Sequence, residues 1–198
     1  VVLIMNIIIA GISFMQFYRA GYFKWNLAWP FLITSIPFAY LGSQFKTSEH
    51  LYNLILGLAL IFPVVRLLTG SPKEKDDKKQ LIFTTALAWG AVIGFASGFL
   101  NIGGGIFLSP VIVLLAWGNA KDAASVSSLF IVCNSLAGLA ATKIASGSFN
   151  STSFSWIAAA VIGGLLGAYL GSHRFNLKTV RYILSIVLCI ASAKLILG

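Results

Sequence analysis

The residues best suited to chemistry in this sequence are three consecutive glycines, Gly103, Gly104 and Gly105, set in an otherwise apolar run. Glycine adopts backbone conformations closed to other residues, and inside a helix each one costs about 1 kcal/mol relative to alanine. We therefore predict that the helix breaks here and that a second helix begins at about Gly105. The N–H groups at a helix N-terminus carry partial positive charge and bind anions. The chemistry that this break offers is the binding of a small anion.

Two polar residues flank the predicted break, Asn101 before it and Ser109 after it. Either side chain could complete the hydrogen bonds of an anion held by the backbone N–H groups. The three glycines have an alternative explanation, because small residues also let two helices approach closely with no ligand between them. Both explanations stay open at this point.

More polar residues lie in the apolar span predicted from Ala120 to Ala145. Ser127, Ser128 and Asn134 could contact the same anion, or they could bond neighbouring helices, as polar side chains in membranes do. Asn6, in the first apolar run, has the same two interpretations. The candidate substrate-binding set is therefore Asn6, Asn101, Gly103, Gly104, Gly105, Ser109, Ser127, Ser128 and Asn134.

The sequence offers no catalytic, cofactor or metal site. Carboxylates within apolar spans are the usual proton relays and cation sites of membranes. Here the five acidic residues all lie at the ends of apolar spans or in loops: Glu49, Glu74, Asp76, Asp77 and Asp122. The two histidines, His50 and His173, fall in predicted polar turns, where solvated histidines are the common case. No paired carboxylates, metal-ligand cluster or nucleophile with a base can be assembled. We therefore do not predict an enzyme, and a cation carrier is disfavoured.

Composition places the chain in a lipid bilayer. Of its 198 residues, 58% are hydrophobic and only 10% are charged, too few to solvate the surface of a soluble domain of this size. The net charge of +9 does not indicate nucleic acid, because the Lys and Arg residues are dispersed at the ends of apolar runs. We predict an all-α polytopic membrane protein with no nucleic-acid partner.

The elements that position the break follow from the apolar runs. The run from 106 to 117 is too short to cross the membrane and predicts a half-helix. Full spans are predicted at about 1–17, 27–45, 49–68, 81–100, 120–145, 154–172 and 177–197. The segment at 71–80 is densely charged and predicts a solvated linker.

An internal repeat divides the chain at this linker. Gly21 and Gly70 recur as Gly147 and Gly198, at offsets of 126 and 128 residues. We predict that residues 1–70 are the three-helix end of a first repeat, and that 81–198 form a second repeat with a broken hairpin and three helices. On this arithmetic a first copy of the glycine break lies in roughly 45 residues upstream of Val1.

Charge predicts how the break is threaded. If the chain makes a hairpin at the glycines, only Lys46, Lys143 and Lys194 of the 14 Lys and Arg residues lie opposite the linker. A single span would instead divide the 14 as nine and five. The positive-inside rule favours the hairpin, a cytoplasmic linker and inverted repeats in the cell (inner) membrane.

Two stretches together resemble a known family: GFASGFLNIGGGIFLSP at 94–110 and AASVSSLFIVCNSLAG at 123–138 are similar to motifs of the sulfite exporter TauE/SafE family of membrane permeases. The resemblance implies transport of sulfite, sulfoacetate or related sulfur-containing anions. It departs from the family in lacking the first motif. A non-transporting membrane subunit stays the alternative, and a homo-oligomer or a larger membrane complex is left open.

Overall fold

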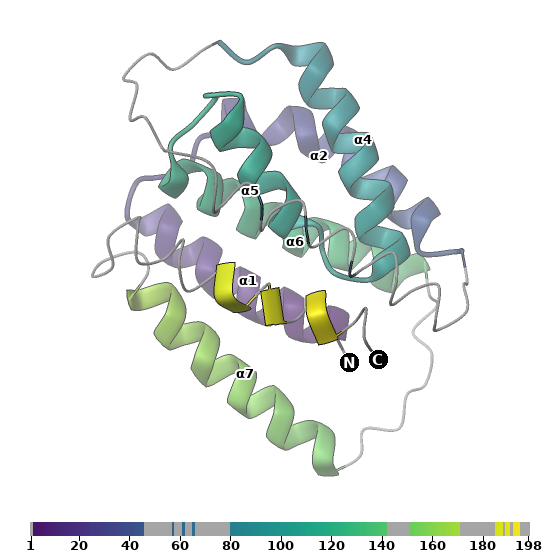
Figure 1. Cartoon of the computed structure of the whole chain (residues 1–198), viewed down its shortest axis with the longest axis vertical. Helices are drawn as coiled ribbons and strands as arrows, with labels where there is room; N and C mark the ends of the chain where they lie inside the picture. Colours follow the sequence, from purple (N-terminus) through teal and green to yellow (C-terminus); the bar gives the residue numbers. More distant parts are fainter. Residues whose placement is uncertain are drawn as a thin grey trace.

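The computed structural model describes residues 2–45, 80–141 and 151–170, and short pieces at 57, 61, 65, 185–187, 189–190 and 192–194. The regular elements in these ranges are all helices (Figure 1). They are α1 (Val2–Arg19), α2 (Trp25–Gly42), α4 (Phe83–Leu100), α5 (Gly105–Leu114), α6 (Ala120–Ala141) and α7 (Ser151–Tyr169). The predicted third span at 49–68 and last span at 177–197 lie almost wholly outside the described residues, as do 71–79, Lys143, His50 and His173.

The described helices have the lengths and surfaces of membrane spans. Three of them, α1, α4 and α6, are long and apolar enough to cross a bilayer. Large apolar side chains also face outward, for example Val92, Ile162 and Leu166, each more than half exposed. Such surfaces are stable in lipid and not in water. The prediction of an all-α polytopic membrane protein is confirmed.

Helix α6 is the centre of the bundle. It packs against α1, α2, α4 and α5, and α7 lies on the outer side of α1 (Figure 1). The side chains of Phe31, Leu108, Ile112 and Phe130 are fully buried where α2, α5 and α6 meet. This core holds α5 in place along most of its length.

Glycines make the contact between α2 and α4 very close. A Cβ on Gly94 would lie 2.5 Å from Ser35 Cα, and a Cβ on Gly98 would collide with the carbonyl oxygen of Ala39. The two helices also share a side-chain bond, because Thr34 Oγ1 donates to Leu87 O at 2.9 Å. The repeated small residues at 90, 94 and 98 therefore serve helix packing, as GxxxG spacing predicts.

The turn between α1 and α2 and the start of α6 lie at the same end of the bundle. Lys24 forms an ion pair with Asp122, and Lys121 Nζ donates to Tyr22 Oη at 2.9 Å. The hairpin threading predicts this placement, whereas a single span through the glycines would put Lys24 and Lys121 at opposite ends. In Figure 1 the chain likewise turns back on itself between α4 and α5.

The division into two repeats remains a prediction. The repeat would equate α1 with α6 and α2 with α7. The observed packing of α2 on α6 then corresponds to the observed packing of α7 on α1, while α1 and α6 contact each other. This is the pattern of a two-fold exchange.

Candidate functional site

The predicted helix break is present at the three glycines. Helix α4 ends at Leu100 and α5 begins at Gly105. Between them Asn101, Gly103 and Gly104 have φ angles of 51°, 79° and 74°, all in the left-handed region. That region costs other residues roughly 1–2 kcal/mol each, while Gly enters it freely and Asn tolerates it. The sequence folds this way because these positions carry residues suited to the turn.

Helix α5 is a half-helix, shorter than the predicted run to Trp117. Its 10 residues span about 15 Å, half of the ~30 Å hydrocarbon core. It ends at Leu114 because the chain then turns, with Ala116 in the left-handed region at φ 56°. Trp117 is thereby brought against Phe31, with ring centroids 6.0 Å apart.

The N-terminus of α5 is buried and has no side-chain cap. The carbonyl oxygen of Gly104 accepts from the N–H groups of Phe107 and Leu108. The N–H of Gly105 precedes these bonds and belongs to the groups that a helix cannot satisfy internally. The uncapped helix N-terminus that the sequence predicted at about Gly105 is therefore present, and anion binding there stays a prediction.

Close packing also accounts for the glycines. A Cβ on Gly104 would lie 2.8 Å from Ser97 Cβ and 2.9 Å from the Phe130 ring, and one on Gly103 would lie 2.7 Å from Ile131. The two explanations left open by the sequence are compatible: the break is pressed against α4 and α6 and is closed in this conformation.

Among the described residues, seven carry a buried side-chain atom without a hydrogen-bond partner: Gln16, Ser35, Ser125 and four on the two elements that meet at the break. These four are Ser97 and Asn101 of the α4 end, and Asn134 and Ser135 of α6, hereafter the unpartnered polar set. Ser97, Asn134 and Ser135 are at most 2% exposed. Ser97 Oγ and Ser135 Oγ lie 3.0 and 3.1 Å from where a Cβ would sit on Gly104 and Gly103. Buried polar groups are nearly always bonded, so this cluster is unusual.

Two other predicted residues meet beside the start of α5. Ser109 Oγ donates to Ser127 Oγ at 2.7 Å, joining α5 to α6. The carbonyl oxygen of Ser127 would lie 2.8 Å from a Cβ on Gly105. The structure thus brings Ser109 and Ser127 together next to the glycines.

The remaining two predicted residues are not part of this cluster. Ser128 Oγ donates to Ala124 O at 2.8 Å, a bond within α6 itself and not to another helix. Asn6 lies in α1, half-buried, while the atoms nearest the three glycines come from α4 and α6. Asn6, which the internal repeat pairs with Asn134, is therefore not among the nearest neighbours of the glycines.

Sequence reasoning missed Ser97 and did not rank Ser135 as a site residue. A signal for Ser97 was available, because it precedes Asn101 by four residues and the two share a helix face. Ser135 adjoins Asn134, which was predicted. For Asn134 and Ser135 the alternative role as bonds between helices is not observed, since their side-chain atoms named above have no partner.

Two cavities lie away from the break. One of about 400 Å³ is lined by Lys24, Trp25, Asn26, Leu27, Leu81 and Trp117. Another of about 520 Å³ is lined by Trp25, Trp29, Leu32, Ile33, Ile36 and Cys133. The ammonium of Lys24, which lines the first cavity, already has a carboxylate partner. Among the described residues, no three His, Cys, Asp or Glu side chains gather as metal ligands.

Comparison with known proteins agrees with this picture. Residues 1–195 match the family described as Sulfite exporter TauE/SafE. The chain is 31% identical, over 202 residues, to the "Probable membrane transporter protein y4hK" of Sinorhizobium fredii (strain NBRC 101917 / NGR234). That alignment covers 98% of this chain and 80% of the relative. No solved structure matches the chain.

Proposed function

Since the chain belongs to the sulfite exporter TauE/SafE family and is a membrane transporter, we propose that it carries a small sulfur oxyanion such as sulfite or sulfoacetate. We place the binding site at the break between α4 and α5. One observation carries this placement: unpartnered atoms of Ser97, Asn101 and Ser135 lie at the connection that leads into the uncapped N-terminus of a half-helix.

The free-energy cost of burying polar groups without a partner supports a role beyond packing for these side chains. A buried polar group without a partner costs roughly 1–3 kcal/mol, and an apolar residue of similar shape would avoid that cost. Ser97 and Ser135 lie beside the glycines, Asn101 belongs to the break, and Asn134 adjoins Ser135 on α6. A solute whose oxygens bond these groups during transport explains why they are there.

The chemistry of the site suits weak, reversible binding of an oxyanion. Ser97 and Ser135 offer hydroxyl donors, Asn134 offers an amide N–H₂, and Gly105 offers a backbone N–H. Each of these donors is neutral, so the anion is held by several hydrogen bonds and the partial charge of α5 without a full counter-charge. Sulfite and sulfonate groups each present three oxygens and can bridge donors on α4 and α6 together.

The orientation that we propose follows the positive charges. The end of the bundle with Lys24 and Lys121 is the one that the positive-inside rule assigns to the cytoplasm, together with the linker at 71–80. On this assignment α5 points its N-terminus toward the middle of an inner membrane, and its C-terminus toward the cytoplasm.

Uptake into proteoliposomes tests the proposal. The purified protein should accumulate labelled sulfite or sulfoacetate down a gradient, and should not accumulate acetate. Ser97→Ala should raise the sulfite concentration needed for half-maximal uptake by roughly 10- to 100-fold. This is the loss expected for a hydrogen bond to a charged group. Ser13→Ala, on α1, is the matched control and should transport as the wild type does. Absence of flux under every gradient would favour the non-transporting subunit.

A further inference from the structure

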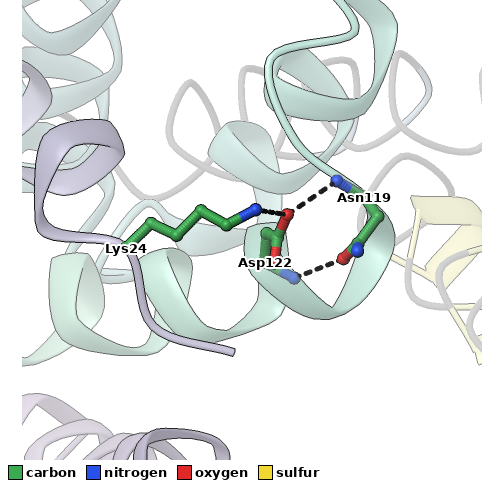
Figure 2. A network of polar contacts seen from close by, with 3 residues as sticks. All are labelled: Lys24, Asn119 and Asp122. Atoms are coloured by element: carbon green, nitrogen blue, oxygen red, sulfur yellow. Dashed lines mark hydrogen bonds and ion pairs between the residues drawn. The ribbon is translucent and has the colours of Figure 1, made fainter. Parts of the chain in front are cut away.

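The ion pair between Lys24 and Asp122 joins parts of the chain that are 98 residues apart. Figure 2 shows Lys24 reaching from the turn between α1 and α2 to the first turn of α6. The two partners differ in exposure: the side chain of Asp122 is 3% exposed, while that of Lys24 is 41% exposed. One partner of the pair is therefore fixed inside the protein, and the other has access to solvent.

Asp122 is held from its own side as well. Its backbone N–H donates to Asn119 Oδ1 at 2.8 Å, and its carboxylate accepts from the N–H of Asn119 at 3.2 Å (Figure 2). This reciprocal arrangement caps α6, and an acidic group is favourable at that helix end. The ion pair therefore holds the capped first turn of α6 against the turn between α1 and α2.

A second contact lies beside the first. Lys121 Nζ donates to Tyr22 Oη at 2.9 Å and lies 4.6 Å from the centroid of the same ring. Two consecutive residues of α6 thus hold two nearby residues of the turn between α1 and α2. We call the Lys24–Asp122 pair, with this neighbour, the latch.

The cavity of about 400 Å³ ends at the latch. Lys24, Leu27 and Trp117 line it. Immediately behind them is Gly118, where a Cβ would lie 3.1 Å from both Leu27 and Asp122, and 3.2 Å from Ile112 of α5. Helix α5 then leads from this point to the glycine break at its other end, through fully buried apolar side chains.

We propose that the latch is a gate of the transporter, and that the cavity is an access vestibule for the anion. With the latch closed, the vestibule is separated from the break by Ile112, Leu108 and Phe31, all of which are buried. Opening needs Lys24 to leave Asp122. The exposure of Lys24 makes this feasible because water can solvate its ammonium, while Asp122 keeps the N–H of Asn119. This inference rests on the proposed transport function.

Cysteine accessibility tests the gate separately from transport. In a chain with Cys133→Ser and Cys189→Ser, Ile112→Cys is placed behind the latch and reacted with a small charged methanethiosulfonate. Lys24→Met should raise the reaction rate by at least about tenfold, because it shifts a minor open state toward dominance. Asp122→Asn should do the same while keeping a side-chain oxygen to cap α6. Arg19→Met, at the end of α1, is the control and should leave the rate unchanged.

The double variant decides whether the two residues act through each other. Lys24→Met with Asp122→Asn should react no faster than either single variant, since each already opens the same pair. Unchanged rates in the single variants, or effects that simply add, would overturn the gate. Flux assays on the wild type distinguish the two failures: an absent flux defeats the transport proposal, while normal flux with an unchanged rate defeats only the gate.

Discussion

Two glycine-rich regions of this molecule use the same residue for different ends. Along α4, Gly90, Gly94 and Gly98 are helical and lie against the backbone of α2. At the break, Gly103 and Gly104 have left-handed backbone and lie against side chains. The first region joins two helices, and the second ends one helix and starts another.

The polar groups of the two regions differ in the same way. At the α2–α4 contact Thr34 and Ser43 donate to carbonyl oxygens of α4, Leu87 and Gly98. Ser35 Oγ at this contact has no partner, and around the break Ser97, Asn101 and Ser135 each carry such an atom. The comparison teaches that glycine alone does not mark a binding site, and that the break differs from the packing surface by its left-handed backbone and by the greater number of unpartnered polar atoms beside it.

The packing region predicts the largest effect on stability. Gly98→Ala would press a methyl group into the Ala39 carbonyl and force α2 from α4, destabilising the fold by more than about 3 kcal/mol. Thermal unfolding in detergent, followed by size-exclusion chromatography, measures this. The matched control is Gly163→Ala on α7, where no atom lies within 4 Å of the added Cβ. A Gly98→Ala protein as stable as that control would show that the contact is looser than described.

The unpartnered polar set predicts opposite effects on stability and function. Asn134→Leu removes a buried amide with no partner, so unfolding should become harder by about 1 kcal/mol while sulfite uptake falls roughly 10- to 100-fold. Unfolding curves and uptake assays on the same preparation provide both values. A variant that is less stable and still transports would instead make Asn134 a structural residue.

The Ser109–Ser127 bond predicts a smaller effect, because it only positions the start of α5. Ser127→Ala loses that bond, which should weaken anion binding by about 1 kcal/mol. The anion concentration needed for half-maximal uptake should therefore rise about fivefold. Ser109→Ala removes the same bond from the other side, so the pair should show nearly equal effects. Unequal effects in uptake would mean that one hydroxyl contacts the solute directly.

Ser128 predicts the smallest effect. Its hydroxyl bonds Ala124 within the same helix, and alanine is well tolerated there, so Ser128→Ala should change stability by less than about 0.5 kcal/mol and leave uptake unchanged. The uptake assay that serves Ser127→Ala checks it. A strong loss of transport at this position would move the site along α6.

The sequence was sufficient for the features that local chemistry decides. Few charges and long apolar runs predicted a helical membrane protein, and the glycines predicted both the break and the start of α5 at Gly105. The motifs at 94–110 and 123–138 identified the family that the comparison confirms. These features depend on backbone conformation and on composition, which are visible residue by residue.

The burial and the hydrogen-bond partners of individual side chains could not be predicted from the sequence in the same way. Asp122 was predicted at a span end and lies there, but its burial to 3% exposure and its pairing with Lys24 from a distant turn were not predicted. Ser128 and Asn134 looked alike as polar residues in one apolar span, but only Ser128 finds a carbonyl for its side chain. The Lys24–Asp122 pair depends on which elements meet, and the rotamer that lets Ser128 bond its own helix depends on the local packing, neither of which a single sequence states.

Equilibrium binding of labelled sulfite to the purified protein tests the central claim most directly. The wild type and Gly163→Leu, whose glycine has open space around it, should bind sulfite saturably. Gly104→Leu places a side chain against Ser97 and Phe130 at a φ of 74°, and should remove binding while the protein still inserts into membranes. Wild-type affinity in Gly104→Leu would contradict the account and move the anion site away from the break.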